Sequence, residues 1–188
     1  MRKLGIIAAA AASLMVSSAA SAQTASVDIN LANWQAEAFF GATNNTRVTI
    51  TLDRTGLGTL PLEIIAIDYI GLEFEALAPS WISELVLSVN DAVDGNLFWD
   101  HNPGVGTNQP GVFTGSGTFP IPALFGSGPF VVSAGDQLLV EVYDTFNDPG
   151  IDAVVQAGTL RITYQAIPEP ATLGLLAGGL PLVLRRRK

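Results

Sequence analysis

Residues 70–76, IGLEFEA, place an apolar or small side chain at every second position, with Gly71, Glu73 and Glu75 between them. Successive side chains of a β-strand point to opposite faces, so this alternation is typical of a strand with one buried face. The same alternation recurs along the interior of the chain, in residues 27–31, 48–52, 85–89, 138–142 and 160–164. Strands with one apolar and one wetter face are what two packed sheets need. The sequence therefore predicts an all-β fold, a β-sandwich of jelly-roll type.

Turn-forming residues separate these segments. Asp94-Gly95 is a favourable pair for a tight hairpin turn. Residues 102–128 are dense in Gly and Pro, which predicts long loops with one short strand. Residues 33–40 are expected to form at most one or two helical turns, and no other part of the interior has a sustained helical period.

The interior of the chain is strongly acidic and contains no cysteine. Three arginines, Arg47, Arg54 and Arg161, stand against sixteen acidic residues, a net charge of −13 for this region of the 188-residue chain. This balance argues against a nucleic-acid partner and against docking on anionic lipid, because both depend on clustered Lys and Arg. It is compatible with a solvated surface, with divalent cations or with neutral glycans. The lack of cysteine excludes thiol catalysis and thiolate metal sites.

The first 22 residues have the three parts of a secretory signal peptide. Residues 1–3 are a short basic start, residues 4–16 are an apolar run, and small residues follow. Ala20 and Ala22 match the small-x-small pattern of signal peptidase, so cleavage is expected before Gln23. The 13-residue apolar run is shorter than the ~17–25 residues of a membrane-spanning helix, which favours a cleaved signal helix over a permanent anchor.

The last 22 residues, 167–188, are organised as a membrane-held tail. Pro-Glu-Pro at 168–170 excludes a helix, residues 171–184 are uncharged, and the chain closes on a basic cluster. That cluster is expected to stop transfer on the cytoplasmic side, and its residues are Arg185, Arg186, Arg187 and Lys188. A 14-residue helix spans only ~21 Å of a ~30 Å hydrocarbon core, so the predicted transmembrane helix suits a temporary anchor.

This tail resembles the PEP-CTERM sorting signal of exopolysaccharide-producing Gram-negative bacteria. The likeness covers residues 167–188 and consists of the Pro-Glu-Pro triplet, the start ATLGLLAG of the apolar stretch and the terminal arginines, in that order. Pro181, deep in the apolar stretch, departs from the pattern. The resemblance implies that Pro168, Glu169 and Pro170 are recognised by exosortase, a membrane cysteine peptidase thought to remove the tag. It implies nothing about the activity of the domain that carries the tag.

The interior is also similar, more loosely, to the jelly-roll P-domain found beside subtilisin-like proteases. The likeness rests on residues 81–87, on residues 140–144 with the acidic Gly-bearing loop that follows, and on residues 158–160. Arg161 stands where that family usually has an aromatic residue. The resemblance implies the fold alone.

No catalytic cluster is predicted. The only histidine, His101, lies in Trp-Asp-His-Asn at the expected end of a strand, and no nucleophile elbow accompanies it, so we interpret it as a polar loop residue. Sixteen acids make a chance carboxylate pair easy, so their number is weak evidence for glycoside hydrolysis. Trp81 precedes a strand and is expected to pack in the core.

One acidic loop has the composition of a calcium site. Asp144, Asp148 and Asp152, with Asn147 and a Pro-Gly turn, offer oxygen ligands on a turning backbone. The alternative interpretation is a plain solvated turn. A second candidate in residues 90–96 has Ala92 where a ligand would be needed.

These observations predict three segments: a signal peptide (1–22), an extracellular β-sandwich (23–166) and a sorting signal (167–188). The chain is expected to leave through signal peptidase, to be held transiently in the inner membrane, and to reach the cell surface or the extracellular matrix through exosortase. The sandwich is expected to be non-catalytic and to bind or organise exopolysaccharide. The alternative is a small secreted glycan-active hydrolase that uses paired carboxylates.

Overall fold

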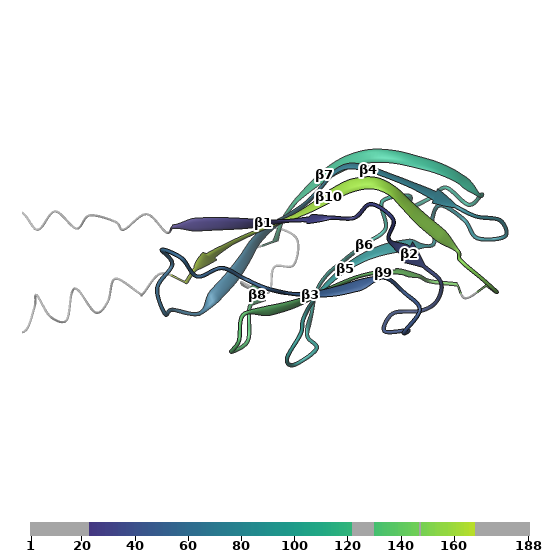
Figure 1. The fold of residues 1–188 in the computed structure, drawn as a ribbon. Helices are drawn as coiled ribbons and strands as arrows, with labels where there is room; N and C mark the ends of the chain where they lie inside the picture. The colour runs from purple at the N-terminus through teal and green to yellow at the C-terminus, as the bar shows by residue number, and fades with distance from the viewer. Residues whose placement is uncertain (1–22, 122–129, 147, 168–188) are drawn as a thin grey trace, which may run out of the picture.

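A computed structural model describes residues 23–121, 130–146 and 148–167. All of its regular strands belong to two antiparallel sheets that face each other, so the prediction of an all-β sandwich is confirmed (Figure 1). The predicted signal helix and transmembrane helix lie outside the described residues. Within them, there is no helix with the length and apolar character needed to cross a membrane.

The first sheet contains the longest strands. Its order is β1 (Thr24–Asn30), β10 (Ala153–Ala166), β4 (Leu62–Ala76) and β7 (Gly111–Pro120). Two short strands extend it, with β2 (Gln35–Ala36) pairing to β10 and β8 (Phe130–Val131) pairing to β4. The second sheet has the order β3 (Arg47–Thr51), β9 (Gln137–Asp144), β5 (Leu85–Asp91) and β6 (Leu97–His101).

The eight main strands pair in a nested order. The first pairs with the last (β1 with β10) and the second with the seventh (β3 with β9). The third pairs with the sixth (β4 with β7) and the fourth with the fifth (β5 with β6). Successive pairs alternate between the two sheets, so the chain behaves as one long hairpin wrapped around the core. This connectivity is the one that a jelly roll requires.

The core fills the space between the sheets with the inward-facing residues of the predicted alternation. In β4, Leu72, Phe74 and Ala76 are buried, and in β10 Leu160, Ile162 and Tyr164 are buried. Each large apolar side chain removed from water contributes roughly 1.5–3 kcal/mol, which is the main stabilising term of a fold without disulfides.

Two predictions about the less regular segments are wrong. Residues 33–40 contain the short strand β2 and turns, with no helix. Residues 102–128, expected to form long loops with one short strand, contain the ten-residue strand β7 at positions 111–120. Gly117 in this strand lies beneath the ring of Tyr69, where a Cβ atom would stand 2.7 Å from the ring. The glycine is therefore a packing requirement of the strand, although glycines in sequence usually indicate a turn.

Both ends of the described chain leave the same end of the sandwich (Figure 1). Thr24 pairs with Gln165 across β1 and β10, and the N–H of Ile167 donates to the carbonyl of Pro61 at 2.9 Å. The predicted sorting signal, which begins at residue 167, therefore follows the last strand without a spacer.

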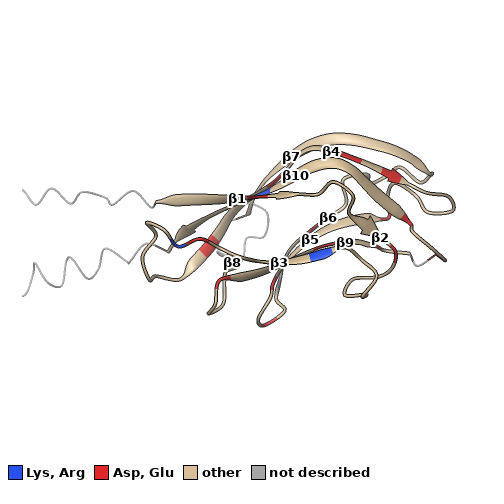
Figure 2. Ribbon diagram, in the orientation of Figure 1, with Lys and Arg blue, Asp and Glu red and all other residues tan. Residues whose placement is uncertain are grey.

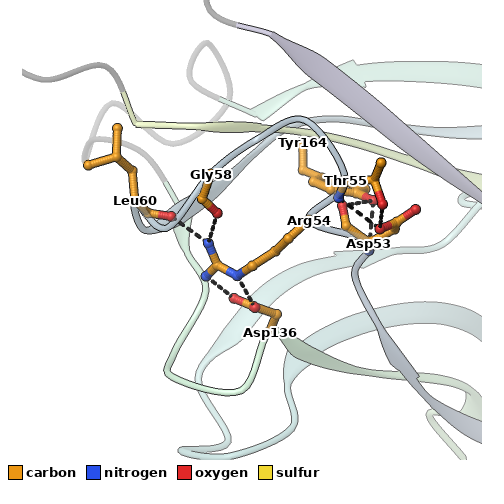
Figure 3. Close-up of polar contacts among 7 residues, drawn as sticks. All are labelled: Asp53, Arg54, Thr55, Gly58, Leu60, Asp136 and Tyr164. Atoms are coloured by element: carbon orange, nitrogen blue, oxygen red, sulfur yellow. Dashed lines mark hydrogen bonds and ion pairs between the residues drawn. The ribbon is translucent and has the colours of Figure 1, made fainter.

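The segment after β3 is fixed at this same end by polar contacts (Figure 3). The guanidinium of Arg54 forms an ion pair with Asp136 and donates to the carbonyl of Leu60 at 2.7 Å. The hydroxyl of Tyr164, near the end of β10, donates to the carbonyl of Asp53 at 3.1 Å. These contacts tie the segment to the last strand next to the point where the chain continues into its predicted tail.

Candidate functional site

Four loops gather at the end of the sandwich opposite the chain termini. They are residues 37–46, 77–84, 102–110 and the described part of 145–152 (all but residue 147), and we call this region the loop end. The strand register places them together, because Ala153 pairs with both Ala36 and Ala76, and Ala76 pairs with Gly111. In the second sheet, Leu85 opposite Asp144 marks the same end.

Backbone hydrogen bonds join the four loops to one another or to strand ends nearby. The N–H of Thr145 donates to the carbonyl of Glu84 at 3.0 Å, and the N–H of Leu77 donates to the carbonyl of Asp152 at 2.8 Å. The N–H of Ile82 donates to the carbonyl of Gln109 at 2.9 Å. The loop end is therefore one connected surface, and a displacement of one loop would shift the loops that are hydrogen-bonded to it.

The loop end carries most of the large apolar side chains that the described sandwich exposes. Six of ten lie there, namely Phe39, Phe40, Trp81, Val105, Phe146 and Ile151. Trp81 is 42% exposed, so its predicted place in the core is wrong, and the buried tryptophans are Trp34 and Trp99. A folding requirement does not explain exposed aromatic rings gathered at one end, and such gathering is typical of an interaction surface.

The loop that carries Phe39 and Phe40 is built around the buried side chain of Asn45. Its Oδ1 accepts from the N–H groups of Glu37 and Ala38, both at 3.0 Å. Its Nδ2 donates to Glu141 Oε1 at 2.8 Å and to two carbonyls of the same loop. The sequence pattern does not identify Asn45 as the residue whose amide organises this loop.

Two carboxyl groups are buried beneath the loop end. Asp144, the last residue of β9, is fully buried, and Asp152, just before β10, is 2% exposed. Asp144 Oδ1 accepts from the N–H of Phe146 at 2.6 Å, and Asp152 Oδ1 accepts from the Ser80 hydroxyl at 2.9 Å. The Oδ2 atom of each carboxyl is buried and has no hydrogen-bond partner in the described structure.

The charges around this pair are negative. Burial raises the pKa of Asp144 to about 7, and the charges of Asp152, Glu84 and Asp148 contribute to the rise. Burial also raises the pKa of Asp152. Ser80 connects Asp152 to the third predicted residue, since its hydroxyl lies 3.3 Å from Asp148 Oδ2. The structure therefore brings the three predicted acids of this loop into one neighbourhood.

No cation in the described part of the chain neutralises these acids (Figure 2). Arg54 pairs with Asp136, and Arg161 pairs with Asp28 on the first sheet. Arg47 donates to the carbonyl of Gly41 at 3.3 Å. As the side chains stand, no group of three or more His, Cys, Asp or Glu among the described residues could hold a metal ion. The predicted calcium site thus rests on two buried carboxyls with a third acid beside them.

The second acidic segment, residues 90–96, differs sharply. Asp91 is also buried, but its Oδ2 accepts from the N–H of Ser133 at 2.7 Å and its Oδ1 from Val93 and Asp94. Burial acts to raise the pKa of Asp91, yet these backbone donors lower it below its usual value. The carboxylate is fully used in fixing the β5–β6 turn, which leaves none of its oxygens for a ligand.

His101 ends β6, as predicted, but it is not a solvated loop residue. Its ring is stacked 5.5 Å from the rings of Tyr69 and Trp99 and lies 4.3 Å from that of Phe119. Burial in this aromatic group lowers the pKa of His101. The imidazole therefore acts as a packing element beneath the sheet.

An open depression of about 310 Å³ lies between β4 and β7, away from the buried acids. It is lined by Gly71, Leu72, Glu73, Thr114, Gly115 and Ser116. It holds a single carboxyl group, that of Glu73, and no aromatic side chain.

The predicted processing residues lie outside the described residues. These are Ala20 and Ala22 for signal peptidase, Pro168, Glu169 and Pro170 for exosortase, and Arg185, Arg186, Arg187 and Lys188 for the membrane stop.

Comparison with known proteins identifies no relative by sequence. No family model matches the chain, and no curated protein matches it. Among solved structures, it is similar to the coat protein of Tobacco streak virus, with 12% identity and a TM-score of 0.31 over 78% of this chain and 88% of that one. It is also similar to dimeric latent PorU from Porphyromonas gingivalis, with 12% identity and a TM-score of 0.36 over 78% of this chain and 14% of that one. A third is the infectious bursal disease virus VP2 subviral particle, with 15% identity and a TM-score of 0.26 over 97% of this chain and 53% of that one. These likenesses bear on neither ligand nor activity.

Proposed function

We propose that the chain is an exported surface or matrix protein, sorted through a PEP-CTERM tag, whose non-catalytic jelly-roll sandwich binds exopolysaccharide through its loop end. The observation that carries the proposal is the gathering of exposed aromatic side chains at the end opposite both chain termini. A tail held in the membrane would then leave the loop end facing outward, toward the matrix.

The chemistry of the loop end favours a neutral or weakly charged glycan. Sugar rings present C–H faces that pack on aromatic rings such as those of Trp81 and Phe146. Carboxylates and backbone carbonyls accept hydrogen bonds from sugar hydroxyls, and backbone N–H groups donate to them. Anionic polymers are disfavoured because Arg47, Arg54 and Arg161, the described cations, are all engaged within the sandwich.

The test is affinity electrophoresis of residues 23–167 in gels that contain a neutral polysaccharide or an anionic one. We expect retardation by the neutral polymer. Removing one aromatic contact by Trp81→Ala or Phe146→Ala should weaken it about fivefold, or about 1 kcal/mol. The matched controls Val93→Ala and Val131→Ala remove exposed apolar side chains outside the loop end and should leave retardation unchanged. Equal losses in both sets, or no retardation in any gel, would refute the assignment of the loop end.

The alternative function, glycan hydrolysis by paired carboxylates, has one observation in its favour. Asp144 has a pKa near 7 and lies close to Asp152, as a general acid beside a second carboxyl would. Its complete burial weighs against this function, because a glycosidic bond must reach the acid in an open cleft. Release of reducing sugar from extracted matrix polysaccharide, lost in Asp144→Asn, would support the hydrolase over the binding module.

A further inference from the structure

The carboxyls of Asp144 and Asp152 pose a charge problem that the described sandwich does not solve. Both are at least 98% buried, and each keeps one oxygen without a partner. A buried carboxylate normally has a basic partner or several donors, because its removal from water is costly. Here the charges of Glu84 and Asp148 act on both carboxyls and make the cost larger.

The fold shows elsewhere how it accommodates a buried acid. The oxygens of Asp91 accept hydrogen bonds from three backbone N–H groups, two in the β5–β6 turn and one at Ser133. Asp144 receives one backbone donor and Asp152 receives one hydroxyl. Glu141 is also fully buried with one oxygen that lacks a partner, but its Oε1 accepts two hydrogen bonds, from the N–H of Gly41 and the Nδ2 of Asn45. Asp144 and Asp152 accept one hydrogen bond each and share one negatively charged neighbourhood, and their free oxygens are the feature that a bound cation would complete.

We propose that Asp144 and Asp152 bind a calcium ion beneath the loop end. Asp148, which shares the Ser80 hydroxyl with Asp152, is the third acid beside the ion. Calcium accepts six to eight oxygen ligands in flexible geometry, and backbone carbonyls, hydroxyls and water supply many of them. Two buried carboxylates are therefore sufficient protein charge for the ion, and a set of three converging acids is not needed. Magnesium is disfavoured because it demands a near-ideal octahedron and gives up its waters reluctantly.

An ion at this position would join two loops that carry exposed aromatic residues. Asp152 is hydrogen-bonded to Ser80, three residues after Leu77 and one before Trp81. Asp144 receives the N–H of Phe146, which is 61% exposed. Calcium would therefore fix the aromatic side chains of loops 77–84 and 145–152 relative to each other. The inference itself does not depend on what the loop end binds.

The experiment uses residues 23–167, which contain all of the strands and core residues that the structure describes. Thermal unfolding is followed in EGTA and with added CaCl₂, and calcium is titrated calorimetrically. At a free calcium concentration ~100 times Kd, a ligand specific to the folded state should raise Tm by about 5–10 °C. Calorimetry should give one ion per chain. The same concentration of MgCl₂ should raise Tm by less than half as much.

Asp144→Asn and Asp152→Asn keep the shape of each side chain and remove its charge. Each should abolish the calcium shift while unfolding in EGTA at or above the Tm of the unaltered sandwich, because a buried charge has gone. Asp94→Asn, an exposed acid of the other loop, should keep the full shift. The proposal is overturned if calcium leaves the unaltered sandwich unchanged, if both Asn variants keep the shift, or if magnesium acts equally.

Discussion

Replacing Asn45 by aspartate should destabilise the sandwich more than replacing it by alanine, although aspartate has the same shape. The side chain of Asn45 takes part in five hydrogen bonds, two as acceptor and three as donor. At ~1 kcal/mol net for each, Asn45→Ala loses at most about 5 kcal/mol. Water can replace part of this at the loop carbonyls, so we expect about 3 kcal/mol.

Aspartate keeps the two accepting bonds, which retain about 2 kcal/mol. It also places an oxygen where Nδ2 now stands, 2.8 Å from Glu141 Oε1. Two unit charges at that distance repel by about 6 kcal/mol at an effective dielectric constant of 20. The repulsion exceeds what the retained bonds contribute, so at pH 7 Asn45→Asp should fall below Asn45→Ala. Acidification favours the neutral form of the introduced carboxyl and should narrow the difference.

Urea unfolding of both variants at pH 7 and pH 4.5 measures these differences. The matched control is Asn44→Asp, since Asn44 is exposed and only donates to Glu37 Oε2 at 3.1 Å. It should cost less than about 1 kcal/mol. The reasoning is refuted if Asn45→Asp is as stable as the unaltered sandwich at pH 7, or if its stability relative to Asn45→Ala does not improve at pH 4.5.

Three further predictions address the aromatic core, the strand glycine and the sorting signal. Because the pKa of His101 is lowered in the folded state, its contribution to stability is complete above pH 6.5 and is lost as the pH falls below that value. In urea unfolding from pH 7.5 to 5, the free energy of unfolding of His101→Phe should therefore fall less with decreasing pH than that of the unaltered sandwich. Gly117→Ala should cost about 1–3 kcal/mol in the same assay, because the new Cβ meets the ring of Tyr69. Alanine at all of residues 168–170 should leave the full-length chain uncleaved in the membrane fraction of a host that has exosortase, as seen by immunoblot, whereas the unaltered chain should accumulate uncleaved only when exosortase is deleted.

Alternation was sufficient to predict the fold class. All six segments chosen by their period of two lie on strands, although two of them extend one residue past the strand end, at Leu31 and Leu52. The Asp94-Gly95 turn joins β5 to β6. The full length of β7 was not predicted because Gly117 is required by the ring of Tyr69 on the partner strand β4, which the sequence of the segment itself does not show. The exposure of Trp81 was not predicted because a residue in the loop before a strand can face either inward or outward.

The buried acids show where sequence reasoning could have gone further. Leu138, Val140 and Val142 face the core, and the next residue of the same parity is Asp144, so the alternation itself places that carboxyl inward. An inward acid at the end of an apolar series is a stronger signal than the number of acids in a loop. Asp148 and Asp152 lie outside the strand, and only the register of β10 against β4 brings them beside Ser80. The alternation in β9 could thus identify Asp144 as a buried carboxyl, whereas the position of Asp152 could be known only from the fold. The proximity of the two makes this loop a binding site to test.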